Sequence, residues 1–312
     1  MHIQQTQLSG KHQGIVGAIG PELAQLLVVG LWASTFIVTK HAFAELSPLA
    51  FVFVRFLLMT ALAFAVLAAG RRSWRIRRAD LARFAAAGLA GYTFYQLGFV
   101  LGLHATSPFT SSLLIAMVPL FTVVLLALRG ERASRRAWAG LALALVGVAV
   151  FLADQWRRGE PGSLTGDLLS LLAAVSFAIY GIVNRPLVRD YPPETYTAYT
   201  LLAGSLPLLA ISTPAALAQD WRAISWLAWG EIVYMVVLPV YVAYMLWNWA
   251  IARRGAAAAT SFSLLVPVAS GALSAWLFAE PFGATKLLGA ALVLAGLAIV
   301  RAPGRAAKTV SD

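Results

Sequence analysis

Two groups of aromatic and polar side chains are the residues best suited to bind a ligand. The first group has the spacing i, i+3, i+4 and i+7, which places its members on one face of a helix: Tyr92, Tyr95, Gln96 and Phe99. A matching face, with a tryptophan beside it, follows later in the chain: Tyr241, Tyr244, Met245, Asn248 and Trp247. Aromatic rings stack on apolar ligands, while hydroxyl and amide groups hydrogen-bond polar ones. The pattern therefore predicts two walls of a binding cavity; the alternative is an aromatic belt at a membrane surface or ordinary core.

Two runs of hydroxyl side chains follow the aromatic faces. The first run is Thr110, Ser111 and Ser112, and the second is Thr260, Ser261 and Ser263. Such groups bond either a substrate or the carbonyl groups of their own helix. Ser111 and Ser261 are candidate substrate-binding residues on the first interpretation, and the second stays open.

Three charged residues need a separate explanation. Arg55 is the one basic residue well inside an apolar segment, where a charge is costly without a partner or water. It either clamps a substrate carboxylate or is structural, binding backbone carbonyls or reaching the nearer membrane surface. Its depth of only about two turns favours the structural role. Glu131 and Glu280 directly follow apolar segments, so we expect them to cap the next helix or to pair with arginines.

The sequence carries no signature of metal, nucleotide or covalent chemistry. It has no cysteine, its four histidines are scattered, and it lacks the G-x-x-x-x-G-K-[ST] motif. A membrane enzyme would gather His, Asp or Glu residues at one membrane face, and the sequence shows no such group. We therefore expect no cofactor, no metal and no catalytic residue.

Long apolar segments must position these side chains. Of the 312 residues, 60% are hydrophobic and only 12% are charged, whereas soluble domains carry about 25% charged residues. Runs of about 20 apolar residues are typical of transmembrane helices. The sequence predicts an all-α integral membrane protein with ten transmembrane helices, at approximately 23–43, 47–69, 81–103, 107–128, 134–153, 165–187, 194–213, 229–252, 256–279 and 283–301.

The positive charge is distributed unevenly between the two sides of such a bundle. The net charge is +11, and with the N-terminus inside, 18 of the 23 lysines and arginines of the loops and tails lie on the inner side. Because cytoplasmic loops are enriched in these residues, both termini are predicted to be cytoplasmic. The arginines separate apolar segments rather than form one basic surface, which argues against nucleic acid as a partner.

The second half of the chain repeats the first. Five residues recur 149 positions later: Tyr92, Tyr95, Glu131, Gly140 and Gly147 recur as Tyr241, Tyr244, Glu280, Gly289 and Gly296. Three earlier residues have identical or similar counterparts at an offset of 145: Trp32, Lys40 and Pro48 correspond to Phe177, Arg185 and Pro193. The glycines of each copy are seven residues apart, which predicts close helix packing.

This repeat sets the predicted domain organisation. Each copy has five helices, and an odd number inserts the second copy upside down, with a shared site near the membrane midplane. We predict the first five-helix repeat at 23–153 and the second at 165–301. A periplasmic linker at 154–164 joins them, and the tails at 1–22 and 302–312 are cytoplasmic.

The combination of these features resembles the EamA-type drug/metabolite transporter superfamily over residues 23 to 301. The matching pieces are Leu31-Trp32-Ala33-Ser34, Ser47-Pro48 with Arg55, Gly130-Glu131 and Ala279-Glu280. A glycine often follows the tryptophan in this superfamily, and Ala33 departs from it. The resemblance implies a carrier that exports small metabolites, often amino acids, from the cytoplasm. The aromatic helices 3 and 8 look like those of exporters of aromatic amino acids, and a drug or lipid-like amphiphile exporter is the alternative.

The resemblance also implies where the substrate lies and where the protein resides. It places the substrate between helices 1, 3, 4, 6, 8 and 9, which adds Trp32 and Tyr180 to the candidate residues above. It implies a monomer in the bacterial cytoplasmic (inner) membrane, whose partners are the lipid bilayer and a small-molecule substrate.

Overall fold

The computed structural model describes residues 20–70, 73–158, 163–254 and 262–301, and these are helical with no strand among them. The first half comprises α2 (Pro21–Ala42), α3 (Pro48–Ala69), η1 (Arg78–Asp80), α4 (Leu81–Gly88), η2 (Leu89–Phe94), α5 (Tyr95–Ala105), α6 (Pro108–Ile115), α7 (Val118–Leu128) and α8 (Arg135–Arg158). The second half comprises α9 (Ser163–Val183), α10 (Arg185–Asp190), α11 (Pro193–Ala218), α12 (Trp226–Val237), η3 (Leu238–Val242), α13 (Ala243–Arg254), α15 (Leu265–Phe278) and α16 (Ala284–Arg301).

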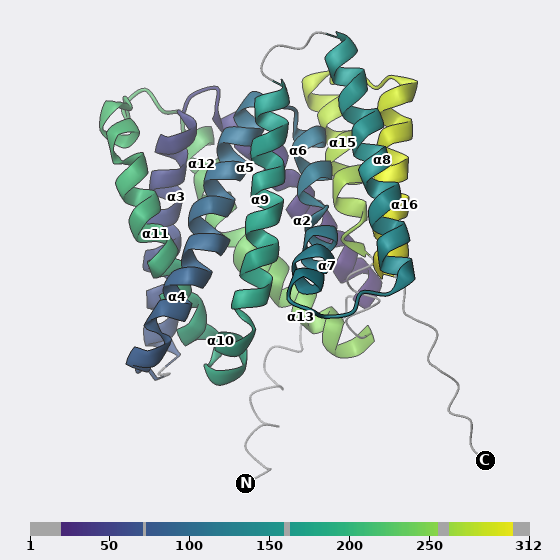
Figure 1. Cartoon of the computed structure of the whole chain (residues 1–312). Helices are drawn as coiled ribbons and strands as arrows, with labels where there is room; N and C mark the ends of the chain where they lie inside the picture. The colour runs from purple at the N-terminus through teal and green to yellow at the C-terminus, as the bar shows by residue number, and fades with distance from the viewer. Residues whose placement is uncertain (1–19, 71–72, 159–162, 255–261, 302–312) are drawn as a thin grey trace, which may run out of the picture.

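The long helices run side by side as one bundle (Figure 1). Within the described ranges, eight helical segments are long and apolar enough to cross a membrane, and two shorter apolar helices follow at Leu265–Phe278 and Ala284–Val300. The ninth predicted span begins at 256, and residues 255–261 lie outside the described ranges. The all-helical membrane architecture is thus confirmed, while the count of ten spans stays a prediction.

Serine and proline define several helix starts. The hydroxyl groups of Ser47, Ser107 and Ser225 accept hydrogen bonds from backbone N–H groups three residues later, at 3.3, 3.1 and 3.2 Å. In the first two cases a proline follows the serine at the first helical position, where its missing N–H costs nothing.

Proline affects the helix interiors in two different ways. The predicted span 107–128 is broken at Ala116 and Met117, just before Pro119, which cannot donate to the preceding turn. In contrast, α11 continues through Pro207 and Pro214 to Ala218, five residues beyond the predicted end at 213. The predicted span 165–187 is also interrupted, because α9 ends at Val183 and the short helix α10 follows.

Two π-helical turns interrupt the long helices at equivalent positions of the repeat. The turn η2 (Leu89–Phe94) contains Tyr92, and η3 (Leu238–Val242) contains its equivalent Tyr241. Their first residues are 149 positions apart, the offset of the repeat in this region. Single π turns in helices are frequent at functional sites, and each of these immediately precedes the helix that carries Tyr95 or Tyr244.

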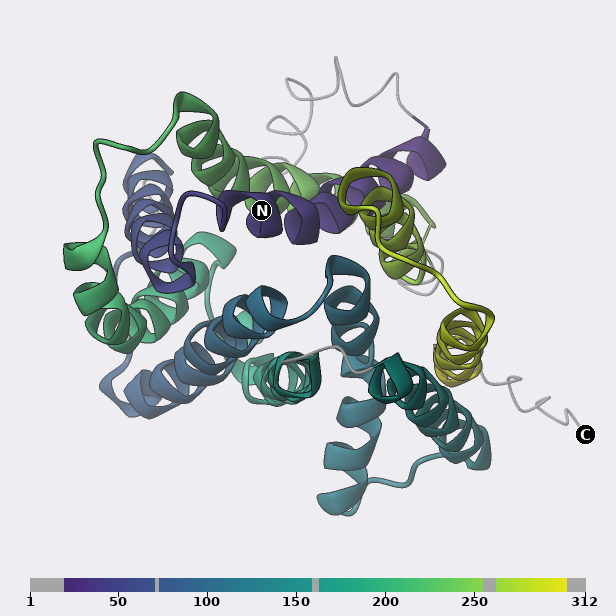
Figure 2. The same cartoon turned by 90° about the horizontal axis from the view of Figure 1, so that it is seen from above.

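The helices pack in pairs drawn from the two halves. Helix α3 packs on α11, α5 on α9, α8 on α16, and α2 on α13 and α15. Viewed from above, the pairs α3–α11 and α8–α16 lie at opposite sides of the bundle, with the other helices between them (Figure 2). A Cβ atom at Gly140 would lie 2.6 Å from the carbonyl oxygen of Gly296, and one at Gly147 would lie 2.8 Å from that of Gly289. The prediction that these glycines permit close helix contact is confirmed.

Candidate substrate-binding site

Tyrosines from both halves of the chain gather at one place in the bundle. Tyr92 lies close enough to Tyr241 and Tyr244 for electrostatic interaction, and so does Tyr95 to Tyr244. Tyr180 from α9 interacts with both Tyr92 and Tyr244. The two aromatic faces therefore lie near each other, and the cavity between them stays a prediction.

The aromatic rings form two chains of contacts around these tyrosines. On one side the ring of Trp32 lies 5.8 Å from that of Tyr244 and 4.9 Å from that of Trp247. On the other side the ring of Phe177 lies 5.0 Å from Tyr95 and 5.4 Å from Tyr180. These are the distances of edge-on or tilted aromatic pairs. The contacts join helices in the bundle interior, which fits a cavity wall better than a belt at the membrane surface.

Polar groups accompany the rings. The hydroxyl groups of Tyr180 and Tyr196 share a hydrogen bond of 2.5 Å, and the amide of Asn184 donates to Tyr196 at 3.0 Å. The indole of Trp32 donates to the carbonyl of Pro239, inside the π turn η3, at 3.3 Å. Tyr196, Asn184 and Phe177 were not among the candidates from the sequence. Phe177 could have been found, because it is the repeat equivalent of Trp32.

Tyr244 exposes 47% of its surface although its ring lies against Trp32. Its hydroxyl group also interacts with Tyr95 and Tyr196, which belong to other helices. Tyr92, Tyr95, Tyr180, Tyr241 and Trp32 are partly buried, as expected for side chains that line an interior space.

The structure does not bring every candidate residue to this place. Phe99 is buried and stacks on Tyr95 with ring planes 6° apart, so it supports the site from behind. Ser111 is fully buried and accepts a hydrogen bond from Ser170 at 3.0 Å. Gln96 is buried, with no described partner for its amide nitrogen. Asn248 is exposed and has no described contact with the tyrosines, and Ser261 lies outside the described residues.

Arg55 is 8% exposed and lies beside the aromatic cluster. Its guanidinium carbon is 5.8 Å from the centre of the Phe56 ring, and the charge interacts electrostatically with Tyr95. Within the described structure its Nε and Nη1 atoms have no hydrogen-bond partner. No hydrogen bond from these two atoms to a backbone carbonyl is described, and the choice between a structural role and a substrate clamp stays a prediction.

A polar network lies at the far end of the long helix that begins at Arg78. The amino group of Lys40 donates to the carbonyls of Leu103, His104 and Thr106, at 2.8 to 2.9 Å. Nearby, Glu280 accepts hydrogen bonds from Ser107 at 2.5 Å and Lys286 at 2.6 Å, and also from Ser274. Glu280 and Lys286 each expose only 6% of their side chains. Thr106 joins the network to α9 through a 2.8 Å hydrogen bond to Asp167.

This network corrects one expectation and shows a contrast within the repeat. Glu280 pairs with a lysine and not with an arginine, and Lys286 and Asp167 were not singled out from the sequence. Its repeat equivalent Glu131 is exposed, without a described side-chain partner. Likewise Lys40 binds a helix end, while its equivalent Arg185 is exposed. The two ends of the bundle therefore differ, although the sequence repeats.

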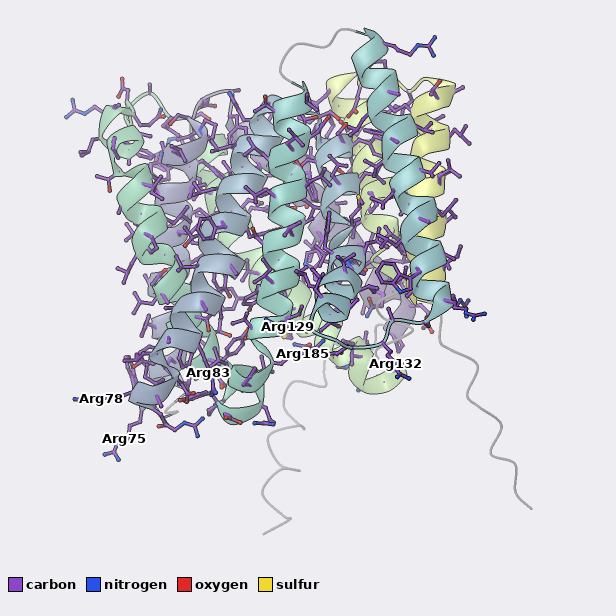
Figure 3. All side chains as sticks on the ribbon, viewed as in Figure 1. Arg75, Arg78, Arg83, Arg129, Arg132 and Arg185 are labelled. Carbon is purple, nitrogen blue, oxygen red and sulfur yellow. The ribbon has the colours of Figure 1, made fainter. Side chains whose placement is uncertain are left out.

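Arginines mark the opposite end of the bundle. Figure 3 labels six of them at that end: Arg75, Arg78, Arg83, Arg129, Arg132 and Arg185. Arg77 donates to Asp80 at 2.6 Å and to Asp190 at 2.8 Å, which fastens the start of the third long helix to α10. Hydrogen bonds from Arg189 and Arg77 hold the pKa of Asp190 below its usual value. No group of three or more potential metal ligands occurs in the part of the chain that the structure describes.

A bundle of long apolar helices, with aromatic and polar contacts between them, is the architecture of a multi-pass membrane protein. The chain belongs to the EamA-like transporter family, whose family model matches residues 21–153 and 164–302. The predicted family is thereby confirmed.

Several relatives resemble this chain along most of its length. A probable terminal-alkyne amino-acid exporter of Streptantibioticus cattleyicolor is 30% identical, with 89% of this chain and 92% of that protein covered. A probable amino-acid metabolite efflux pump of Salmonella typhimurium is 28% identical over 88% of this chain and 92% of the relative. An uncharacterized transporter of Archaeoglobus fulgidus is 28% identical over 88% of this chain and 96% of that protein. The fold is shared with a protein of known crystal structure, whose sequence is 22% identical to this chain. The match covers 90% of this chain and 96% of that protein's chain, with a TM-score of 0.59.

Proposed function

We propose that this transporter exports small aromatic or apolar amino acids and related metabolites across the bacterial cytoplasmic membrane. The ring contacts of Trp32 with Tyr244 and of Phe177 with Tyr95 carry the proposal, because each brings an aromatic ring of one half of the chain against a tyrosine of the other half. Two relatives bear the names of amino-acid exporters or efflux pumps, which supports an amino acid as the substrate.

The mechanism that we propose is facilitated alternating access by a monomer with ten transmembrane helices in two inverted repeats, 23–153 and 165–301. Three features support the repeats. The π turns η2 and η3 occur at equivalent positions. The pair Trp32–Tyr244 corresponds to the pair Phe177–Tyr95. The contact of α2 with α13 likewise corresponds to that of α9 with α5. Rocking of one repeat against the other would open the shared space to each side in turn.

The proposed orientation has the tails 1–22 and 302–312 in the cytoplasm and the linker 154–164 in the periplasm. The six arginines at one end of the bundle support it, because cytoplasmic loops are enriched in basic residues (Figure 3). Lys40 and Lys286 lie at the other end, where both are neutralised by carbonyl groups or by Glu280.

Efflux from proteoliposomes tests the function. Liposomes with the purified protein would be loaded in separate batches with phenylalanine, alanine, a lipophilic drug cation or a fluorescent lipid. We expect saturable efflux of phenylalanine that exceeds that of alanine and that protein-free liposomes lack. Movement of the drug or the lipid alone would replace our proposal with the amphiphile exporter, and equal rates for loaded and protein-free vesicles with every amino acid would refute amino-acid export.

A further inference from the structure

Arg55 is a buried cation, and two of its three guanidinium nitrogens have no hydrogen-bond partner among the described residues. It lies on α3, seven residues after the start of the helix at Pro48, or about 10 Å along the helix axis. Only 8% of the residue is exposed, and neither Nε nor Nη1 has a partner in the described structure. An uncompensated charge within a membrane protein is costly, so such a residue ordinarily pairs with another group or faces water.

Lys40 shows how this fold neutralises a cation that has a structural role. Its amino group donates three hydrogen bonds of 2.8 to 2.9 Å to the carbonyl groups at the end of α5. Those carbonyls carry the negative end of the helix dipole, so the charge is well compensated. No comparable arrangement is described for Arg55, whose guanidinium lies 5.8 Å from the centre of the Phe56 ring and interacts electrostatically with Tyr95.

The missing partner of Arg55 is therefore best supplied by a ligand. A guanidinium group presents a planar set of N–H donors that matches a carboxylate with two parallel hydrogen bonds. Tyr95, which interacts with Arg55, also contacts Phe177 and belongs to the aromatic site. A compound with an aromatic ring and a carboxylate could thus place its ring among the tyrosines and its charge at Arg55.

We propose that Arg55 binds the carboxylate of the substrate and makes the transporter selective for aromatic compounds with a free carboxylate. Amides, esters and amines of the same shape are then poor ligands. The inference deepens the proposed function and rests on the same aromatic site.

Matched ligands and matched variants test this inference. Phenylacetate and phenylacetamide differ only in the charged group, so their binding to the purified protein isolates the carboxylate. We expect wild type to bind phenylacetate roughly 10- to 100-fold more tightly than phenylacetamide, as for a charge-assisted hydrogen bond. The Arg55→Gln variant should bind both ligands with the same weak affinity. Arg78→Gln makes the same change at an exposed arginine and should retain the wild-type ratio.

A stability measurement separates ligand binding from a structural role. Without ligand, Arg55→Gln should unfold at the same temperature as wild type or higher, because it removes an uncompensated charge. Phenylacetate should raise the unfolding temperature of wild type and leave that of the variant unchanged. If Arg55→Gln cannot be purified, Arg55→Lys keeps the charge but loses the planar set of donors, and should lower the affinity ratio several-fold. A wild-type ratio in either variant, or no ratio in wild type, would overturn the inference.

Transport distinguishes failure of this inference from failure of the proposed function. Phenylalanine efflux that is unchanged in Arg55→Gln would leave amino-acid export standing and remove Arg55 from the site. Phenylacetate binding that depends on Arg55, without efflux of any amino acid, would establish the carboxylate site and reject amino-acid export.

Discussion

The ring of Trp32 lies edge-on to that of Tyr244, with centroids 5.8 Å apart, and its repeat equivalent Phe177 lies 5.0 Å from Tyr95. One contact joins α2 to α13, and the other joins α9 to α5. Each half of the chain thus supplies one tyrosine and the ring that packs on the tyrosine of the other half. Under the proposed alternating access, movement of one half against the other would change these two contacts.

The first prediction concerns the two tyrosines of these pairs. Tyr95→Ala or Tyr244→Ala removes a stacking partner worth about 0.5–1.5 kcal/mol, which corresponds to roughly 2- to 13-fold in affinity. Transport of phenylalanine in proteoliposomes should therefore weaken more than transport of alanine, at equal amounts of reconstituted protein. Phe94→Ala is a matched control, because Phe94 lies on the same long helix and is 52% exposed. Gly140→Leu should instead reduce the yield of folded protein, since its side chain would meet the backbone of α16. Wild-type rates for both substrates in both tyrosine variants would show that the aromatic site is wrong.

The sequence predicted the features that depend on local pattern and on repetition. The lengths of the apolar runs predict where the helices lie, and the 149-residue offset relates Tyr95 to Tyr244. The π turns were not predictable, because a change from i+4 to i+5 hydrogen bonding leaves the apolar pattern nearly unaltered. The role of Arg55 was judged from its depth, yet depth does not reveal whether a carbonyl lies within reach. The repeat assigns Glu131 and Glu280 to equivalent positions. It therefore could not predict that Glu131 is exposed while Glu280 is buried in an ion pair.

The second prediction concerns the buried pair of Glu280 and Lys286. Glu280→Gln leaves Lys286 without its counter-charge at a place where each side chain is only 6% exposed. Breaking a buried ion pair by removing one partner costs about 3–5 kcal/mol. We expect a clear loss of stability in chemical unfolding of the protein in detergent. Glu131→Gln is the control from the repeat, and as an exposed substitution it should change stability by less than about 0.5 kcal/mol. Equal effects of the two substitutions would contradict the asymmetry between the ends of the bundle.

The third prediction concerns the backbone just before each of these glutamates. Gly130 has φ of 85°, and its repeat equivalent Ala279 has φ of 49°, in the left-handed region that a side chain disfavours. Ala279→Gly should therefore stabilise the protein by up to about 1 kcal/mol, and Gly130→Ala should destabilise it by about 1 kcal/mol. Unfolding temperatures of the two single variants check the signs. A lower unfolding temperature for Ala279→Gly than for wild type would show that the positive φ of Ala279 does not destabilise the fold.

The fourth prediction concerns the orientation in the membrane. Arg75 is exposed and lies with the other arginines at the end that we place in the cytoplasm (Figure 3). The chain has no cysteine, so a single Arg75→Cys substitution gives a unique label site. An impermeant thiol reagent should label it in inverted membrane vesicles and not in intact cells. A cysteine replacing Asp220, which is exposed between α11 and α12, should show the reverse pattern. Labelling of residue 75 from outside would overturn the orientation, and labelling of both positions from the same side would overturn the inverted repeat.

The fifth prediction concerns pH and the contact between Glu45 and Ser225. The backbone N–H and the hydroxyl of Ser225 donate to the Glu45 carboxylate at 2.6 and 2.7 Å, which lowers the pKa of Glu45 below its ordinary value of 4.5. A pKa that is lower in the folded protein means that the contact stabilises the fold above pH 4.5 and loses this effect as the pH falls through the lowered value. The unfolding temperature of wild type should therefore fall more steeply than that of Glu45→Gln between about pH 5 and pH 3. Ser225→Ala keeps the carboxylate and the backbone donor but removes the hydroxyl donor, and should give an intermediate slope. Parallel curves for wild type and Glu45→Gln would show that this contact does not link protonation to folding.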